Sequence, residues 1–464
     1  MKLSKSFLAA FLSLLFYVPH SQAQTATVNW TNVHQVIDGF GAANAQNGGT
    51  SVSSSDQNFL FGTGPGQLGM SILRVGVTDG VGDPGSCLTV SASCAGGYVS
   101  DMKAVIANGG RVYASPWSPP AAFKTNGSVD CTAGTGNGAL ATADYGAYAT
   151  WLSNFVRSLQ TEDGITLFAL SIQNEPSNCQ NYDSALWSAG AIANFVENNL
   201  GPTFSSAGYT TMIFTPETST YGNVSGLGGT CMTDSSCSQY VGGVNWHDYA
   251  ASYNPPDSIN ATPYPGGWPT KRYWETEVSD QNTYDGSISN GIQWAAYIDD
   301  RLAVENANAW LYWQMENLCC AGDNSGLTEG PGISTVAKRA YVLAQYSKFV
   351  RPGYFRIDAT HKPQTGVSVS AYQQTSNNAL VIIATNYTSS AVSQTFTLTN
   401  APTFTTLTPY ITSASQSLAT VSNVTVSSNS FTYSLPAQSI VTFVGNTATS
   451  DGPTPPTGLT ASVN

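Results

Sequence analysis

The feature that most restricts the fold is an alternation of strands and helices that repeats eight times between residues 36 and 350. The expected strands are short apolar runs at residues 36–41, 71–75, 111–114, 167–170, 212–217, 243–247, 271–277 and 308–313. The clearest of the intervening helices carries one apolar stripe, made of Tyr148, Trp151, Leu152, Phe155, Val156 and Leu159. Others are expected at residues 185–198, 290–305 and 335–349. This α/β pattern, with no long strand-only or helix-only stretch, favours a closed (β/α)8 TIM barrel over an open sheet.

The composition changes after residue 351. Residues 360–445 are rich in Thr, Ser and Val, and short alternating runs such as 379–383 and 439–443 are separated by turn residues every ~8–12 positions. We therefore expect a second domain at residues 351–445, a small antiparallel β-sandwich with either a structural or a sugar-binding role. Residues 24–35 include an alternating strand that is able to pair with this distant domain.

The two ends of the chain have their own signatures. Lys2 and Lys5 precede an apolar run at residues 7–18, and Ser21-Gln22-Ala23 supplies a cleavage site, so residues 1–23 are expected to be a signal peptide of a secreted, extracellular protein. That run is too short to span a bilayer. Residues 446–464 form a Ser/Thr/Pro linker, and the segment from 457 resembles the opening of a fibronectin type III repeat.

Charge and aromatic content narrow the possible partners. Loss of the signal peptide leaves 14 basic residues against 28 acidic ones, a net charge of −14, which argues against nucleic acid or an anionic membrane as a partner. Ten Trp and 23 Tyr suit stacking on the sugar rings of a polysaccharide, although many of them must fill the core. The four scattered His show no metal-ligand spacing, so we expect no metal ion and no cofactor. We also expect the protein to be a monomer.

The cysteines point to disulfides, as is usual in an exported chain. All eight lie in segments that follow expected strands, so disulfides between them would cross-link the loops around one mouth of the barrel. The spacing predicts the pairs Cys87–Cys94, Cys131–Cys179 and Cys231–Cys237. The adjacent Cys319 and Cys320 either form a vicinal disulfide or pair elsewhere.

Two of the expected strands end in glutamates. The apolar run 167–170 leads into Asn174-Glu175-Pro176, and the run 271–277 ends in Glu277, 102 positions later. That separation is close to three strand–helix units of ~31 residues, so both carboxylates would face each other at the C-terminal rim, where such barrels keep catalytic groups. Pro176 predicts an extended backbone at Glu175. In the alternative interpretation, Glu175 only satisfies the amides of its loop.

A converging carboxylate pair predicts glycoside hydrolysis. A gap of ~5–5.5 Å gives retention through a covalent intermediate, whereas ~6.5–9.5 Å leaves room for a water and gives inversion. The acid must keep its proton and the nucleophile must stay ionised, so we expect a raised pKa for the acid.

An ordered set of motifs resembles glycoside hydrolase family 30, in the clan of retaining (β/α)8 glycosidases. The matching segments are residues 36–41, 114–120, 171–176, 246–249, 276–277 and 346–357. The resemblance implies a barrel with a side-attached β-sandwich that the N-terminal strand joins. It also implies that Glu175 is the acid/base and Glu277 the nucleophile.

Several neighbours of this pair are candidate substrate-binding residues. Asn174 is placed to bond the sugar 2-hydroxyl or to brace its loop. Tyr249 matches the family tyrosine that reaches the nucleophile, and a nearby Arg74 would lower the pKa of a carboxylate. Trp117 and Trp313 either stack on sugars or fill the barrel.

The remaining candidates are polar residues near the same rim. His247 is equally compatible with a structural and a catalytic role. Glu217 and Glu316 follow strands and either of them can border the substrate. Glu275 lies two residues before Glu277, so we expect it on the same side of the strand, deeper in the barrel and paired with a basic residue.

Specificity depends on the loop after the last barrel strand. Family 30 includes xylanases, glucuronoxylanases, β-1,6-glucanases, β-1,6-galactanases and glucosylceramidase-like enzymes, and its glucuronoxylanases typically use an arginine in this loop. Here residues 314–324 contain two acidic residues and no basic one. The expected activity is therefore endo-β-1,4-xylanase without strict dependence on glucuronic acid side groups. The alternatives are an endo-β-1,6-glucanase or β-1,6-galactanase, an inverting hydrolase with the same glutamates, and a non-catalytic carbohydrate-binding protein, which has no need of both glutamates.

Overall fold

The computed structural model describes residues 25–45, 50–77, 96–249, 264, 266–320 and 322–446. The expected signal peptide, the linker after residue 446, and Cys87 and Cys94 lie outside the described residues.

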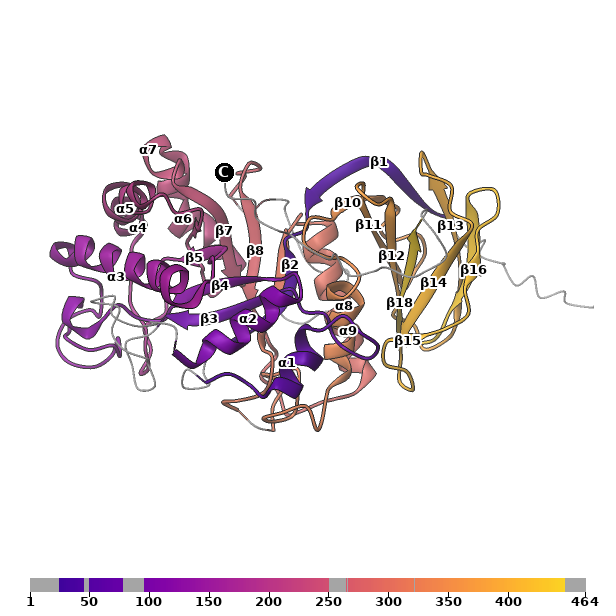
Figure 1. The fold of residues 1–464 in the computed structure, drawn as a ribbon, viewed down its shortest axis with the longest axis horizontal. Coiled ribbons are helices and arrows are strands. Elements are labelled where there is room, and N and C mark those ends of the chain that lie inside the picture. Colours follow the sequence, from indigo (N-terminus) through magenta and orange to yellow (C-terminus); the bar gives the residue numbers. More distant parts are fainter. Residues whose placement is uncertain are drawn as a thin grey trace, which may run out of the picture.

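Eight parallel strands close into a barrel, as predicted (Figure 1). The strands pair in chain order, and the last pairs with the first, so the sheet has no free edge. They are β2 (Gly39–Asn44), β3 (Ile72–Val77), β4 (Arg111–Pro116), β5 (Ala169–Ser171), β6 (Met212–Phe214), β7 (Val241–His247), β8 (Arg272–Glu277) and β9 (Ala309–Gln314).

Apolar side chains fill the inside of this barrel. Its inner cluster comprises Ile72, Tyr113, Ala169, Phe214, Trp274, Ala309 and Leu311, all fully buried. The opposite faces of the strands pack against the helices, which explains why the strand sequences are apolar at successive positions. Because the centre is packed solid, any substrate must bind at an end of the barrel.

The helices surround the barrel. They are α1 (Ser54–Phe61), α2 (Val99–Ala107), α3 (Tyr145–Ser158), α4 (Ala189–Phe195), α5 (Gly201–Ala207), α6 (Val224–Thr233), α7 (Ser235–Ser238), α8 (Ile288–Ala303) and α9 (Lys338–Ser347). The apolar stripe of α3 is buried as predicted. The helix expected at residues 185–198 begins only at Ala189, because the Ser188 side chain accepts the Ala191 N–H and caps it there.

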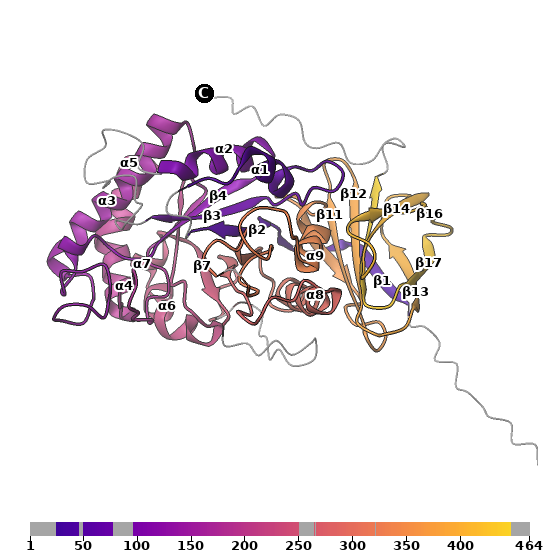
Figure 2. The same ribbon diagram turned by 90° about the horizontal axis from the view of Figure 1, so that it is seen from below.

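A second sheet of ten strands lies beside the barrel (Figures 1 and 2). It contains β1 (Ala26–Val36), β10 (Phe355–Ala359), β11 (Val367–Gln374), β12 (Ala379–Asn386), β13 (Val392–Thr399), β14 (Thr406–Thr412), β15 (Ala419–Thr420), β16 (Val424–Thr425), β17 (Ser430–Leu435) and β18 (Ser439–Asn446). The sheet folds over itself, so that Phe396 and Phe431 on one part pack against Phe443 on the other. The predicted fold class is thus confirmed.

The first strand of the chain belongs to this second sheet. In Figure 1, β1 crosses from the barrel to the far sheet. There it pairs antiparallel with β10 and parallel with β13. The β1–β13 pairing is an exception in an otherwise antiparallel sheet.

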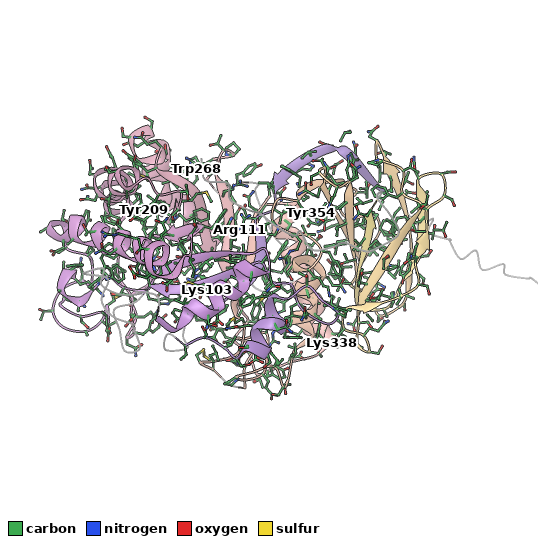
Figure 3. All side chains as sticks on the ribbon, viewed as in Figure 1. Lys103, Arg111, Tyr209, Trp268, Lys338 and Tyr354 are labelled. Carbon is green, nitrogen blue, oxygen red and sulfur yellow. A yellow bond between two sulfur atoms is a disulfide. The ribbon has the colours of Figure 1, made fainter. Side chains whose placement is uncertain are left out.

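Helices α8 and α9 lie between the barrel and the second sheet in both views (Figures 1 and 2). From α9, the Lys338 ammonium, which is labelled in Figure 3, donates to the Gln416 carbonyl at 2.8 Å. From α8, the Asp299 carboxylate lies 2.7 Å from His361 Nε2 on the loop after β10. Polar contacts therefore join the two parts of the molecule across these helices.

Three disulfides are present among the described cysteines. Cys131–Cys179 and Cys231–Cys237 form as predicted. Cys319 and Cys320 bond to each other rather than to distant partners. The first bridge ties the loop after β4 to the loop after β5, which carries Glu175. The second joins α6 to α7, so the expectation that every bridge would tie loops at one mouth of the barrel is wrong for this pair.

Candidate active site

Glu175 and Glu277 meet at one end of the barrel, where β5 and β8 terminate. A carboxylate oxygen of each lies within 4.8 Å of the other, and both side chains are almost fully buried. This gap is shorter than the ~6.5–9.5 Å by which inverting enzymes separate their carboxyl groups to hold the attacking water. The geometry therefore matches the retaining arrangement and not the inverting one.

The backbone at Glu175 differs from the prediction. Its φ is +46°, in the left-handed region, although Pro176 favours an extended conformation. Its N–H donates to the carbonyl of Glu217, whose own φ is +52° and whose N–H donates to the Asn245 carbonyl. Hydrogen bonds across neighbouring strand ends thus hold both glutamates in a conformation that non-glycine residues rarely adopt.

The carboxylate of Glu175 has two protein partners. His247 Nδ1 lies 2.9 Å from Oε1, and Asn178 Nδ2 donates to Oε2 at 2.7 Å. Burial acts to raise the pKa of Glu175, but the hydrogen bond and charge of His247 outweigh it and lower the pKa. The pKa of Glu175 is thus lowered and not raised as expected for the acid, because the hydrogen bonds of His247 and Asn178 and the charge of Arg74 favour its carboxylate form.

The carboxylate of Glu277 is held by the two residues expected near it. The Tyr249 hydroxyl donates to Oε1 at 2.8 Å, and the Arg74 guanidinium donates to Oε2. Burial raises the pKa of Glu277 and outweighs the opposing charges of His247 and Arg74. His247 Nδ1 is 3.6 Å from Glu277, farther than from Glu175, so the cation acts more strongly on Glu175.

Arg74 also orients Asn174. Its NH2 group donates to the Asn174 Oδ1 at 2.7 Å, so the amide of Asn174 keeps its own NH2 group for a sugar hydroxyl. The guanidinium is fully buried and lies 4.5 Å from the ring centroid of Trp117. One side chain therefore contacts the Glu277 carboxylate, the Asn174 amide and the Trp117 ring.

Trp117 and Trp313 form that wall together. Their ring centroids are 6.0 Å apart, and the two rings cluster with Ala43 and Ala45 at the ends of the strands. They belong to this separate rim cluster and not to the side chains that fill the barrel. Their position suits contact with a ligand above Arg74.

Glu217 is fully buried next to Glu175 and Glu277, so it has no exposed atom with which to border a substrate. Its carboxylate accepts hydrogen bonds from the hydroxyls of Tyr113, Ser115 and Thr276, and Arg74 lies 3.3 Å away. Burial alone would raise the pKa of Glu217, but Arg74, His247 and these donors lower it to about 2. Sequence reasoning placed Glu217 at a strand end but gave no signal of this donor set, which comes from the three strands β3, β4 and β8.

Glu275 points away from the barrel axis, contrary to the prediction. A register shift between β7 and β8 occurs next to it, and its carboxylate reaches Arg301 on α8, with 2.8 Å between Oε2 and Nε. The expected pairing with a basic residue is confirmed. Glu316 is also buried, and its Oε2 accepts the Gly332 N–H at 2.6 Å.

The loop after β9 is braced internally. Asn317 Nδ2 donates to the Cys320 carbonyl at 2.8 Å and to the Asp323 carboxylate at 3.0 Å, next to the vicinal disulfide. Among the described residues of this loop up to Asn324, none carries a positive charge. The charged side chains of this loop are those of Glu316 and Asp323, and both are acidic.

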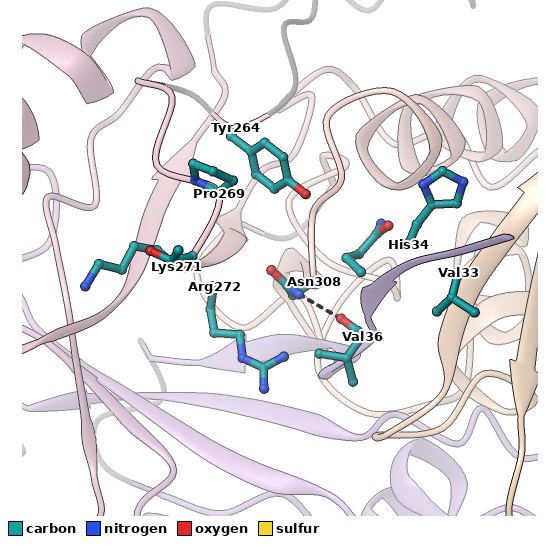
Figure 4. A pocket seen from close by; sticks show the side chains of 10 residues that line it. Val33, His34, Val36, Tyr264, Pro269, Lys271, Arg272 and Asn308 are labelled. Atoms are coloured by element: carbon teal, nitrogen blue, oxygen red, sulfur yellow. Dashed lines mark hydrogen bonds between the residues drawn. The ribbon is translucent and has the colours of Figure 1, made fainter.

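A cavity of about 550 Å³ lies near the start of β8, at the opposite end of the barrel (Figure 4). Lys271 in its wall donates to two backbone carbonyls, and Asn308 donates to the Val36 carbonyl, as the dashed line shows. None of the clustered carboxylates lines it. The cavity is therefore separate from the candidate active site.

Two groups of described residues have the spacing of metal ligands. One is Glu175, His247 and Glu277, whose atoms already bond to one another and to Arg74 and Tyr249. The other lies at the domain boundary and includes His361.

Among the residues that the structure describes, no helix is long and apolar enough to cross a membrane.

A (β/α)8 barrel with two facing carboxylates at its C-terminal rim defines a retaining glycoside hydrolase. Residues 98–322 match the model of the glycosyl hydrolase family 30 TIM-barrel domain. Glucuronoxylanase XynC from Bacillus subtilis is 31% identical over 437 residues, which cover 91% of this chain and 92% of that protein. The chain belongs to glycoside hydrolase family 30.

Two further relatives bear on specificity. The family 30 subfamily 8 xylanase Xyn30A from Clostridium acetobutylicum has 32% identity and a TM-score of 0.77, and the match covers 91% of this chain and 99% of that one. An endo-1,6-beta-D-glucanase from Neurospora crassa is 26% identical over 253 residues, or 52% of this chain and 50% of that protein.

Proposed function

We propose that this protein is an endo-β-1,4-xylanase that does not depend strictly on glucuronic acid side groups. The observation that carries the proposal is the loop after β9, in which acidic residues stand where glucuronoxylanases of the family typically have an arginine. The whole-length similarity to two xylanases, one of them a glucuronoxylanase, supports the xylan backbone as substrate.

In this proposal Glu277 is the nucleophile. Its carboxylate attacks the anomeric carbon while Glu175 protonates the departing glycosidic oxygen, and a glycosyl ester of Glu277 forms. Water then attacks the same carbon, gives its proton to Glu175 and releases Glu277. Arg74 and Tyr249, which donate to Glu277, stabilise the carboxylate both before attack and after release.

The substrate-binding roles follow from the same positions. Trp117 and Trp313 present aromatic faces on which sugar rings stack. Asn174, fixed by Arg74, donates to the 2-hydroxyl of the sugar at the cleavage site. His247 contributes through Glu175, its hydrogen-bonded partner.

Charge is the reason for the proposed tolerance of undecorated xylan. An anionic uronic acid near Glu316 and Asp323 meets repulsion and no cation from this loop. Burial raises the pKa of Glu316 to about 7, so the repulsion from that residue increases as the pH rises. A neutral xylose at the same place carries no such cost.

A β-1,6-linked glucan is the second candidate substrate. The similarity to an endo-1,6-beta-D-glucanase over about half of this chain favours it, and so does the missing arginine. A panel of linear xylan, glucuronoxylan, β-1,6-glucan and arabinogalactan, with sizing of the products, separates the candidates.

We expect internal cleavage of both xylans at comparable rates. A rate on glucuronoxylan more than 100-fold above that on linear xylan would contradict the proposed independence, and cleavage of the β-1,6-glucan alone would replace the substrate. Glu175→Gln and Glu277→Gln should each lower kcat by at least about 10²-fold, whereas the surface variant Glu329→Gln should not. NMR of the first-formed anomer should show retained configuration.

We also propose that the protein is secreted after cleavage behind Ala23 and acts as a monomer. The disulfides, which persist in oxidising compartments, support export. Mass spectrometry of the exported protein and size-exclusion chromatography test both points.

A further inference from the structure

His247 lies among three glutamates that come from three neighbouring strand ends. Its Nδ1 is 2.9 Å from Glu175 and 3.6 Å from Glu277, and its Nε2 is 3.6 Å from Glu217. The imidazole is fully buried, so no bulk water competes for these contacts. A proton on this ring is therefore in reach of the catalytic acid and isolated from solvent.

Glu217 is fixed below the ring. Three hydroxyls and Arg74 surround its carboxylate, and its backbone N–H and carbonyl are bonded to Asn245 and Glu175. It has neither the room to approach a substrate nor an exposed atom with which to touch one. What it supplies to His247 is a permanent negative charge.

We propose that His247 stores the proton that Glu175 delivers to the leaving group, and that Glu217 is the counter-ion that keeps this proton on the ring. The inference rests on the proposed acid/base role of Glu175. His247 and Glu217 act through Glu175, so both are positioning residues.

The charges around the ring support this division of roles. Burial would lower the pKa of His247, but Glu277, Glu175 and Glu217 outweigh it and raise the pKa to about 9. Arg74 stands beyond Glu217 and Glu277, and the Tyr249 ring lies 6.2 Å from the imidazole, so the carboxylates dominate. In the free enzyme the contacts and these shifts favour a proton on His247 and a negative charge on Glu175.

Sugar binding shifts the proton along the existing hydrogen bond. Displacement of water removes the solvation of the Glu175 carboxylate, which favours the neutral pair over the ion pair. The proton moves from His247 Nδ1 to Glu175 Oε1, and Glu175 then donates a proton to the glycosidic oxygen as the bond to the anomeric carbon breaks. In the second step Glu175 takes a proton from the attacking water and the imidazole is protonated again, so the cycle returns every proton.

Glu277 is a poorer recipient for the same proton. Its Oε1 accepts from Tyr249 and its Oε2 from Arg74, and it is 0.7 Å farther from Nδ1 than Glu175 is. The nucleophile thus stays ionised while its neighbour is protonated.

The test compares two substrates that differ in their need for an acid. Cleavage of xylan requires protonation of a sugar alcohol, whereas 2,4-dinitrophenyl β-xylobioside loses a phenolate that needs no proton. We expect His247→Asn, which keeps a donor near the Nδ1 position, to lower kcat on xylan by about 10²-fold but on the aryl glycoside by less than about 5-fold. Glu217→Gln should follow the same pattern.

The pH profile supplies a second readout. In wild-type enzyme the alkaline limb of kcat/KM reports loss of the stored proton, so it should move by at least one pH unit to lower pH in His247→Asn. The control is His361→Asn, which removes a comparable His–carboxylate contact at the domain boundary and should leave both readouts unchanged. The double variant at His247 and Glu217 should be no worse than the poorer single variant.

Equal losses on both substrates with an unchanged pH profile would overturn the proposal and leave His247 a structural residue. If wild-type enzyme does not cleave xylan, the proposed substrate fails instead, and the comparison is repeated with the glycan from the panel that it does cleave. The two failures are therefore distinguishable.

Discussion

Glu175 and Glu277 carry the same functional group in one buried cluster, yet their pKa values move in opposite directions. Part of the difference follows from the His247 imidazole, which lies 2.9 Å from Glu175 and 3.6 Å from Glu277, and part from Asn178, which donates a hydrogen bond to Glu175. For double displacement the proposed acid needs the higher pKa and the proposed nucleophile the lower one, so the two shifts in the free protein run opposite to that need. Substrate binding has to reverse these shifts.

Removal of the Tyr249 hydroxyl should shift the acid limb of the pH profile. This hydroxyl donates to Glu277, and a donor to the ionised form lowers the pKa of a carboxylate. In Tyr249→Phe the pKa of Glu277 rises further, so protonation inactivates the nucleophile at higher pH. A hydrogen bond to a charged group of about 1.5–3 kcal/mol corresponds to a shift of about one to two pH units in kcat/KM.

Tyr209→Phe is the matched control. Its hydroxyl donates to the Ser153 carbonyl on α3, and Tyr209 is labelled in Figure 3, so its removal should leave the profile unchanged. An acid limb that stays in place in Tyr249→Phe would show that the tyrosine does not act on the nucleophile.

The sequence was sufficient to place Glu175 and Glu277, but not to orient their surroundings. Strand ends are visible as a change from apolar to polar residues, and these two changes are sharp. The left-handed backbone at Glu175 results from hydrogen bonds to a neighbouring strand, which override the local preference imposed by Pro176. The outward turn of Glu275 results from a register shift between β7 and β8, and such a shift leaves no mark in the sequence of one strand.

At the scale of elements, the strands were predictable because burial on both faces makes them continuously apolar. The ends of the helices were harder to predict from the sequence. The start of α4 depends on the Ser188 cap, which competes with several other polar residues of the same loop. The pairs Cys131–Cys179 and Cys231–Cys237 were predictable from spacing, although only the first of them joins two loops that follow barrel strands.

The two longer-range disulfides should differ in their contribution to stability. Cys131–Cys179 closes 48 residues and Cys231–Cys237 closes six. The chain-entropy relation gives about 4 kcal/mol for the first and about 2 kcal/mol for the second. Replacement of both cysteines of a pair by serine should therefore lower the free energy of unfolding more for the first bridge, as measured by urea denaturation.

The Cys231–Cys237 double variant is the reference for that comparison, because it removes the same number of sulfur atoms. The first bridge ties the loop that carries Glu175. We therefore expect kcat to fall in the Cys131–Cys179 variant and to stay unchanged in the Cys231–Cys237 variant. A larger loss of stability from the short bridge would contradict the entropic explanation.

At the scale of the whole molecule, an ion pair joins α8 of the barrel to the loop after β10. His361 Nε2 lies 2.7 Å from Asp299, and Asp300 is 3.7 Å away. Burial acts to lower the pKa of His361, but the two aspartates raise it. Burial acts to raise the pKa of Asp299, but His361 and two serines lower it.

The contact should stabilise the protein most at mildly acidic pH. The contribution of His361 is complete below about pH 6.5 and is lost as the pH rises through its higher folded-state pKa. That of Asp299 is present above about pH 3.9 and is lost as the pH falls through its lower folded-state pKa. The difference in melting temperature between wild type and His361→Asn should therefore be largest near pH 5 and should shrink towards pH 9.

His34 offers the control, since it is a histidine on β1 that lies 3.5 Å from Asp358 and is partly exposed. His34→Asn should show a smaller and flatter difference. A His361→Asn effect that does not vary between pH 5 and pH 9 would mean that packing, and not charge, joins the two domains there.

The position of β1 has a consequence for how the chain is completed. The first described strand, β1, is inserted between β10 and β13, which lie more than 300 residues later in the sequence, so its edges stay uncovered until those two strands have been synthesised. A fragment that stops at residue 350 would carry an open-edged ribbon ready to pair with another copy of itself. The barrel and the second sheet therefore have to be completed together, because β1 precedes the barrel in the sequence but pairs with strands that follow it.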